Sequence, residues 1–200
     1  PLSEVDTRLR PEGGTGMHAV SPDAFARYQS EEAWTWEHMA LCRARPVFGS
    51  DAGRERLAAI VEAVLRLPRN RAKVVQDAAR MRDEMNRHNP PQSGFDVKLG
   101  PGGLVDLEFA VHVLQLTRHV GLDPSLETAL AALVADGFIE KNVVEAQKLL
   151  TKILVMMRLV APGNVKPTPE TWQLVAEACG AGSWDELLAE HDAARQSISE

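Results

Sequence analysis

Residues 102–119, Gly-Gly-Leu-Val-Asp-Leu-Glu-Phe-Ala-Val-His-Val-Leu-Gln-Leu-Thr-Arg-His, decide the fold of this chain. After the two glycines, apolar side chains cover most of the circumference of a predicted helix that runs from Leu104 to about His119. A helix with so wide an apolar surface is buried between other helices. The stretch therefore predicts the central helix of a helical domain, with the other helices packed around it.

Helices are expected on both sides of this segment, because capping residues precede runs whose apolar positions lie three and four residues apart. Residues 143–160 are apolar on all sides, which predicts a second buried helix. Residues 95–99 are expected to form a short extended segment. The remaining helices are expected at 31–45, at 51–67 with Asp51 as its cap, at 71–88 and at 125–135, and three more begin with the caps Ser21, Thr168 and Ser183.

The first fifty residues have a different pattern from the rest. Side chains at 5–10 alternate between two faces, as in a β-strand, and the three glycines within residues 13–16 require a loop. We therefore expect a mainly α protein. The remnant of a mixed α/β domain occupies residues 1–50, and a helical bundle occupies residues 51–200.

The composition is typical of a soluble globular chain and excludes several classes of protein. With 44% hydrophobic and 25% charged residues, the 200-residue chain is too apolar for a disordered tail. Its 22 Lys and Arg against 28 Asp and Glu give a net charge of -6, which argues against a nucleic-acid-binding face. No apolar run approaches the roughly 18 residues that span a bilayer.

The cysteines indicate the cellular compartment, and the first residues indicate whether the chain is part of a longer protein. Cys42 and Cys179 lie far apart in predicted helices, which argues against a disulfide scaffold or a thiolate zinc site. A reducing cytoplasm is therefore expected. The chain opens with neither a signal peptide nor an initiator methionine, so we expect it to be cut from a longer protein.

Asp6, Arg8 and Arg10 share one face of the predicted strand. A carboxylate there suits a divalent cation, and two guanidinium groups beside it suit the charge of a polyphosphate. The same spacing also fits an edge strand that carries a ladder of surface ion pairs. Spacing alone favours this simpler hypothesis.

Asp106 and Glu108 interrupt the apolar helix directly after its two glycines. Buried or half-buried carboxylates need partners, so these two are candidates for a site. The alternative is that they form structural ion pairs with Arg or Lys on neighbouring helices, and the residues alone leave both hypotheses open. His38 and His112 lie among apolar residues without a metal-ligand partner, which indicates structural histidines.

Three separated blocks of the sequence have the character of motifs. The first is EVDTRLRP at 4–11 followed by the glycines, the second is EAWTWEHMAL at 32–41 running into RAR at 43–45, and the third joins FDVK at 95–98 to GGLVDLEF at 102–109. In content, order and spacing, these blocks closely resemble the glutamine synthetase adenylyltransferase family.

This resemblance implies the C-terminal part of a nucleotidyltransferase domain over residues 1–50, followed by the helical bundle. Enzymes of the family have two such halves. The N-terminal half removes AMP from a tyrosine of glutamine synthetase by phosphorolysis, and the C-terminal half attaches AMP from ATP. Residues 32–38 resemble the C-terminal, adenylylating half. The implied partners are glutamine synthetase, the signalling protein PII and ATP, with neither nucleic acid nor a membrane.

The resemblance also implies roles for residues of the first block. Nucleotidyltransferases of this superfamily hold two Mg²⁺ ions on three carboxylates, and Asp6 resembles the third of these. Asp6 is therefore the implied catalytic and metal-binding residue. Arg8 and Arg10 are implied to bind phosphate or to brace the strand.

The third block implies support for the active site. Lys98, Asp106 and Glu108 fall within the motif that the family carries in its helical domain. The resemblance implies that they stabilise the active-site face from across the cleft between the two domains.

One element of the family pattern is missing. The Gly-Ser…Asp-x-Asp motif, which supplies the other two carboxylates, lies upstream of the Asp6 position in the family, and only five residues precede Asp6 here. We therefore expect this chain to be inactive alone. The alternatives are a helical module that binds a regulator or the target enzyme, the deadenylylating half, or a related PII uridylyltransferase.

Overall fold

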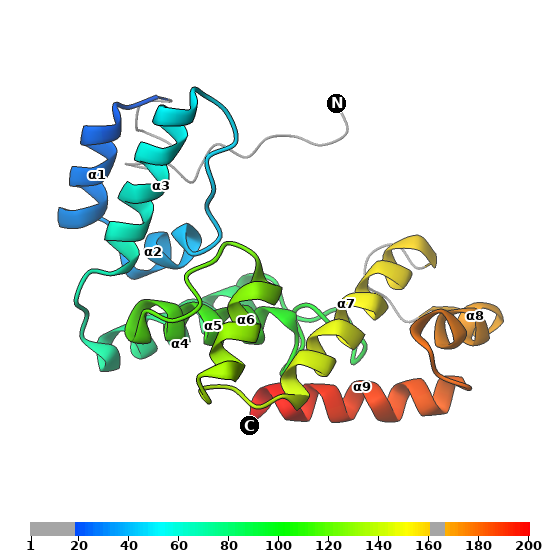
Figure 1. Cartoon of the computed structure of the whole chain (residues 1–200). Helices are drawn as coiled ribbons and strands as arrows, with labels where there is room; N and C mark the ends of the chain where they lie inside the picture. The colour runs from blue at the N-terminus through cyan, green and yellow to red at the C-terminus, as the bar shows by residue number, and fades with distance from the viewer. Residues whose placement is uncertain (1–18, 161–166) are drawn as a thin grey trace.

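The computed structural model describes residues 19–160 and 167–200, which form nine α-helices and no strand. Figure 1 shows the helices packed on one another, so the mainly α class is confirmed. None of these helices is long and apolar enough to cross a membrane. The helices are α1 (Pro22–Glu31), α2 (Thr35–Leu41), α3 (Asp51–Leu65), α4 (Arg71–His88), α5 (Leu104–Arg118), α6 (Leu126–Ala135), α7 (Asn142–Val160), α8 (Pro169–Cys179) and α9 (Trp184–Ser199).

The predicted strand at 5–10 and the glycine loop at 13–16 lie outside the described residues. The α/β part of the expected fold therefore stays a prediction, as does the division into 1–50 and 51–200. Helices on the two sides of residue 50 contact each other, since α1 packs against α3. Arg56 Nη2 of α3 also lies 2.6 Å from Asp23 Oδ1 of α1.

The helix α5 is central among the described helices, as its sequence predicts. It contacts α2, α4, α6, α7 and α9. Leu104 packs with α7, α8 and α9, Leu107 packs with α6, and Leu116 packs with α2, α3 and α4. Each such buried leucine stabilises the fold by about 1.5–3 kcal/mol. One helix thus contributes to all three apolar clusters.

The helix α7 is buried along one stripe, which corrects the expectation of burial on all sides. Val155 and Leu159 lie off this stripe and are 51% and 73% exposed. An apolar run predicts burial only where enough neighbouring helices exist to cover it. The buried stripe consists of Val143, Ala146, Leu150, Ile153 and Met157.

The structure divides the predicted helix at 31–45. Helix α1 ends at Glu31, and α2 spans only Thr35–Leu41. Between them Trp34 is extended, with φ −88° and ψ 163°, and its N–H donates to Glu37 Oε2 at 2.9 Å. This bond caps a new helix. The segment is therefore not one continuous helix, although its residues favour helix throughout.

Most predicted helix starts are correct. The hydroxyl groups of Ser21, Ser125 and Ser183 each accept a hydrogen bond from a backbone N–H of the first turn. The cap of α3 is Ser50 rather than Asp51, because the Ser50 hydroxyl accepts the N–H of Gly53 at 3.2 Å. Serine and aspartate are about equally good N-caps, so the sequence does not decide which of two adjacent residues of these types caps the helix.

Two buried histidines, His112 and His191, and the half-buried His38 make the fold sensitive to acid. Burial lowers the pKa of His38 and His191, and it lowers the pKa of His112 to about 4, with Arg43 as a smaller cause. An unfolded histidine ionises near pH 6.5, so below that pH the unfolded chain binds protons that the folded chain does not. Their contribution to stability is complete above about pH 6.5 and is lost as the pH falls below it, down to about 4 in the case of His112.

We predict that His112→Gln reduces the pH dependence of the free energy of unfolding. The loss between pH 7 and about 4.5 should shrink by about 2–3 kcal/mol, because one buried site no longer titrates. Urea denaturation at both pH values measures this. The control is His88→Gln, since the His88 side chain is 77% exposed. If His112→Gln and the unsubstituted chain lose the same stability, His112 is not a source of the acid sensitivity.

Candidate functional site

The site residues expected from the sequence fall into two groups. Asp6, Arg8 and Arg10 lie outside the described residues, so their roles stay predictions. Lys98, Asp106 and Glu108 lie together on the loop before α5 and on the first turns of that helix. Their shared region is therefore the candidate site within the described part of the chain.

Asp96 folds the loop before α5, which corrects the expectation of an extended segment at 95–99. The carboxylate is buried, and Oδ1 accepts hydrogen bonds from Lys98 N at 3.1 Å and Leu99 N at 3.0 Å. An aspartate that binds the backbone two and three residues ahead favours a turn over a strand. The loop also binds the N-terminal end of α5, because Val97 O accepts a hydrogen bond from the N–H of Leu104.

The two glycines before α5 are required by close approach of the backbone. Gly102 has φ +68°, and a Cβ there would overlap Arg195 O of α9. A Cβ on Gly103 would lie 2.7 Å from Val97 O. Only glycine therefore allows the loop to lie against both α9 and its own first residues.

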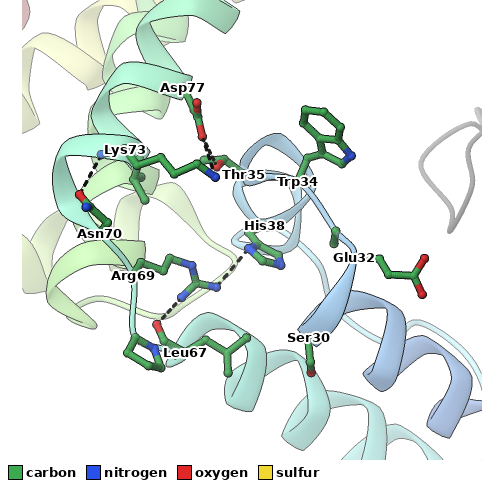
Figure 2. Close-up of a pocket in the computed structure, with 13 residues that line it drawn as sticks. Ser30, Glu32, Trp34, Thr35, His38, Leu67, Arg69, Asn70, Lys73 and Asp77 are labelled. Carbon is green, nitrogen blue, oxygen red and sulfur yellow. Dashed lines mark hydrogen bonds and ion pairs between the residues drawn. The ribbon is translucent and has the colours of Figure 1, made fainter.

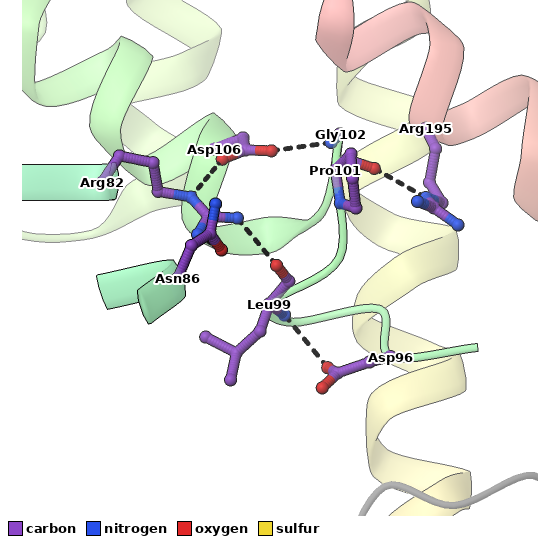
Figure 3. Close-up of polar contacts among 8 residues, drawn as sticks. All are labelled: Arg82, Asn86, Asp96, Leu99, Pro101, Gly102, Asp106 and Arg195. Atoms are coloured by element: carbon purple, nitrogen blue, oxygen red, sulfur yellow. Dashed lines mark hydrogen bonds and ion pairs between the residues drawn. The ribbon is translucent and has the colours of Figure 1, made fainter. Parts of the chain in front are cut away.

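Both carboxylate oxygens of Asp106 are used within the fold, as Figure 3 shows. Oδ1 accepts from Arg82 Nε at 2.5 Å, and Oδ2 accepts from Gly102 N at 2.7 Å. Arg82 also donates through Nη2 to Leu99 O at 2.7 Å. Asp106 therefore joins α4, the loop and α5, as the hypothesis of structural ion pairs expects. Sequence reasoning missed Arg82, because it is one of many charged residues on α4.

Glu108 links α5 to the segment after α2. Its Oε2 lies 3.2 Å from Arg43 Nη1, and the side chains of Arg43 and Glu108 are 56% and 31% exposed. The second and third sequence blocks therefore meet in the folded chain. Lys98 is exposed, and its backbone carbonyl accepts the N–H of Val105 at 3.1 Å. Of the three expected support residues, Lys98 is exposed, whereas Asp106 and Glu108 are half-buried.

A cavity of about 480 Å³ lies between the α1–α2 turn and the α3–α4 turn (Figure 2). Thr35 Oγ1 donates to Asp77 Oδ2 at 2.7 Å on one wall, and Lys73 Nζ lies 4.0 Å from the same oxygen. The indole of Trp34 lines the cavity and is 71% exposed. The walls therefore combine one aromatic surface with partly paired charges.

His38 in this cavity has structural partners. Its Nε2 lies 2.8 Å from Gln29 O, and its Nδ1 lies 3.3 Å from Arg69 Nη2. A neutral ring that donates through Nε2 and accepts at Nδ1 satisfies both contacts, and burial lowers the pKa of His38 accordingly. The same Arg69 guanidinium donates to the carbonyls at the end of α3, which are those of Val64, Leu65 and Leu67.

The described residues do not fit the Mg²⁺ that the family resemblance implies. Within 19–160 and 167–200, no group of three His, Cys, Asp or Glu side chains is placed to hold a metal ion. Asp106 is an example of a carboxylate that is already used, because both of its oxygens accept hydrogen bonds from the chain. Asp6, the metal ligand that the resemblance implies, lies outside the described residues, so its role stays a prediction.

We predict that Asp106→Ala lowers the free energy of unfolding by about 2–4 kcal/mol, because it leaves the Arg82 guanidinium buried without its carboxylate. The Arg82 side chain is only 13% exposed. Glu108→Ala should cost less than about 1 kcal/mol, because its partner is largely solvated. Urea denaturation of both variants measures this difference, and equal costs would contradict it.

Comparison with known proteins finds two family models on the chain. The model for Glutamate-ammonia ligase adenylyltransferase matches residues 1–60, and the model for GlnD PII-uridylyltransferase matches residues 71–200. The two matches meet at the contacts described above. Thr35 and Arg43 lie in the first matched segment, and Asp77 and Glu108 lie in the second.

Curated relatives are bifunctional glutamine synthetase adenylyltransferase/adenylyl-removing enzymes. One from Brucella suis biovar 1 is 41% identical over 164 residues, covering 79% of this chain and 17% of the relative. One from Agrobacterium fabrum is 39% identical over 195 residues, covering 93% and 20%. One from a Bradyrhizobium species is 33% identical over 208 residues, covering 100% and 21%.

The chain spans about a fifth of the length of these relatives. The similarity nevertheless extends over most of this chain and includes both matched segments. The chain therefore belongs to the glutamine synthetase adenylyltransferase family, with a helical part that a PII-uridylyltransferase model also describes.

Proposed function

We propose that this chain is part of an enzyme that transfers AMP from ATP to a tyrosine of glutamine synthetase and so regulates nitrogen assimilation. The observation that carries this proposal is 33–41% identity to enzymes named for that activity, over most of the chain. Their name covers both adenylylation and its reversal. Residues 32–38 favour the adenylylating half, as their resemblance implies.

In this function Asp6 provides an oxygen ligand for Mg²⁺, and Arg8 and Arg10 neutralise phosphate charge. Mg²⁺ held there would offset the charge of the triphosphate and favour loss of the proton from the attacking tyrosine hydroxyl. The tyrosine oxygen then bonds to the α-phosphorus of ATP as the bond to pyrophosphate breaks. The adenylyltransferase model that covers residues 1–60 supports these assignments, because all three residues lie within it.

Lys98, Asp106 and Glu108 support the active-site face in this proposal. Asp106 does so by ordering the loop that carries Lys98, because it accepts the N–H of Gly102 and binds Arg82. Glu108 does so by holding Arg43, which follows the Trp-rich second block. Lys98 is the exposed member of the three, so it is the one suited to reach across the cleft.

A second candidate function is the binding of PII by the helical part. It is supported by the PII-uridylyltransferase model that matches residues 71–200. Such a role does not need the catalytic carboxylates. We propose the cytoplasm as the compartment, a choice supported by two cysteines, Cys42 and Cys179, that are free and buried.

Transfer of labelled AMP to glutamine synthetase tests the proposed function. We predict that the 200-residue chain transfers none, and that a version extended upstream by about one hundred residues, enough to complete a catalytic domain, transfers it. Asp6→Ala in the extended version should lower the rate roughly a thousandfold, because several kcal/mol of charge stabilisation are lost. Asp23→Ala is the control, since Asp23 is 82% exposed and pairs with Arg56 on α3.

Two other outcomes of this assay have defined meanings. Release of AMP from adenylylated glutamine synthetase on addition of phosphate, without forward transfer, would assign the chain to the deadenylylating half. Transfer by the 200-residue chain itself would show that the missing carboxylates are not needed.

A further inference from the structure

Arg195 of α9 binds both ends of the loop before α5. Its Nε donates to Pro101 O at 2.7 Å, and its Nη1 donates to Gly94 O at 3.0 Å (Figure 3 shows the first contact). The guanidinium group is a rigid fork with donors in fixed directions. A single half-buried side chain therefore connects two carbonyls of the loop to a helix about one hundred residues away in the sequence.

The loop also packs directly on α9. At Gly102 no side chain fits between the loop and the backbone of Arg195. The Phe95 ring lies against two rings of α9, with centroids 5.1 Å from Trp184 and 4.9 Å from His191. Three turns of α9 thus contact one short loop.

The opposite side of the loop is held by α4. Arg82 donates to Leu99 O at 2.7 Å, while Asp96 accepts the N–H groups of Lys98 and Leu99. The loop is therefore fixed between two arginines from different helices. Lys98 lies between the residues that these two arginines bind, and it is exposed.

We propose that Arg195 is a positioning residue for adenylyl transfer that acts through this loop on Lys98. This inference rests on the proposed function, in which Lys98 supports the active-site face. Without Arg195, the carbonyls of Gly94 and Pro101 lose their partner, and the loop is held by α4 and by packing alone. A charged group displaced by about 1 Å from its working position can cost a hundredfold in rate.

The test uses the full-length enzyme that contains this chain, with labelled ATP and glutamine synthetase. Arg195→Met should lower kcat about tenfold, whereas KM for ATP changes less than about threefold, because positioning rather than binding is lost. Arg195→Lys, which keeps one donor group, should recover part of the rate. Gln196→Met is the matched control, since the exposed Gln196 side chain on the same helix binds Glu200, the C-cap of α9.

A double-mutant cycle separates positioning from a general effect on the fold. In a Lys98→Met background, Arg195→Met should change kcat by less than about twofold, because the group it positions is already gone. An equal loss in both backgrounds, or no loss from Arg195→Met alone, would overturn the proposal. If the unsubstituted enzyme transfers no AMP, the proposed function itself fails, which is a different result from additive losses in an active enzyme.

Hydrogen exchange keeps the proposal testable if Arg195→Met fails to fold. In Arg195→Lys, the amides of residues 94–103 should exchange faster than in the unsubstituted enzyme, while those of α6 stay unchanged. Unchanged exchange in the loop, or a uniform increase across the bundle, would overturn the role of Arg195 as the loop's anchor.

Discussion

Burial of α5 is the constraint on which the rest of the described structure depends. Leu104, Leu107 and Leu116 each enter a different apolar cluster, so helices from both ends of the chain pack on this one element. The apolar packing of α5 therefore fixes the positions of its polar residues. Asp106 and Glu108 lie in the first turns of α5. There Asp106 meets Arg82 of α4, and Glu108 meets Arg43 after α2.

The same packing brings together two segments with different relatives. The segment matched by the adenylyltransferase model meets the segment matched by the PII-uridylyltransferase model through Thr35 with Asp77 and Arg43 with Glu108. Of these contacts, the Arg43–Glu108 pair is largely solvated and contributes little to stability. The pair nevertheless shows that the second sequence block lies against the start of α5.

Much of the fold was predictable because it rests on local chemistry. Apolar spacing predicted α4 and α5, and the Ser125 cap predicted α6, close to their observed bounds. The errors arose where one side chain changed the backbone locally. Glu37 caps a new helix at Trp34, and Asp96 turns a segment that was expected to be extended. Both act through a single hydrogen bond or a pair of them, which composition does not reveal.

The residues alone predict that α5 is buried, that Gly102 and Gly103 precede it, and that two carboxylates interrupt it. The partners of those carboxylates become known only from the packing of the helices. Arg82 and Arg195 come from helices distant in the sequence, and nothing local distinguishes them from other arginines. Pairing of charges depends on distance in space, and that distance is set by how the helices pack, because burial of apolar surface outweighs any single ion pair.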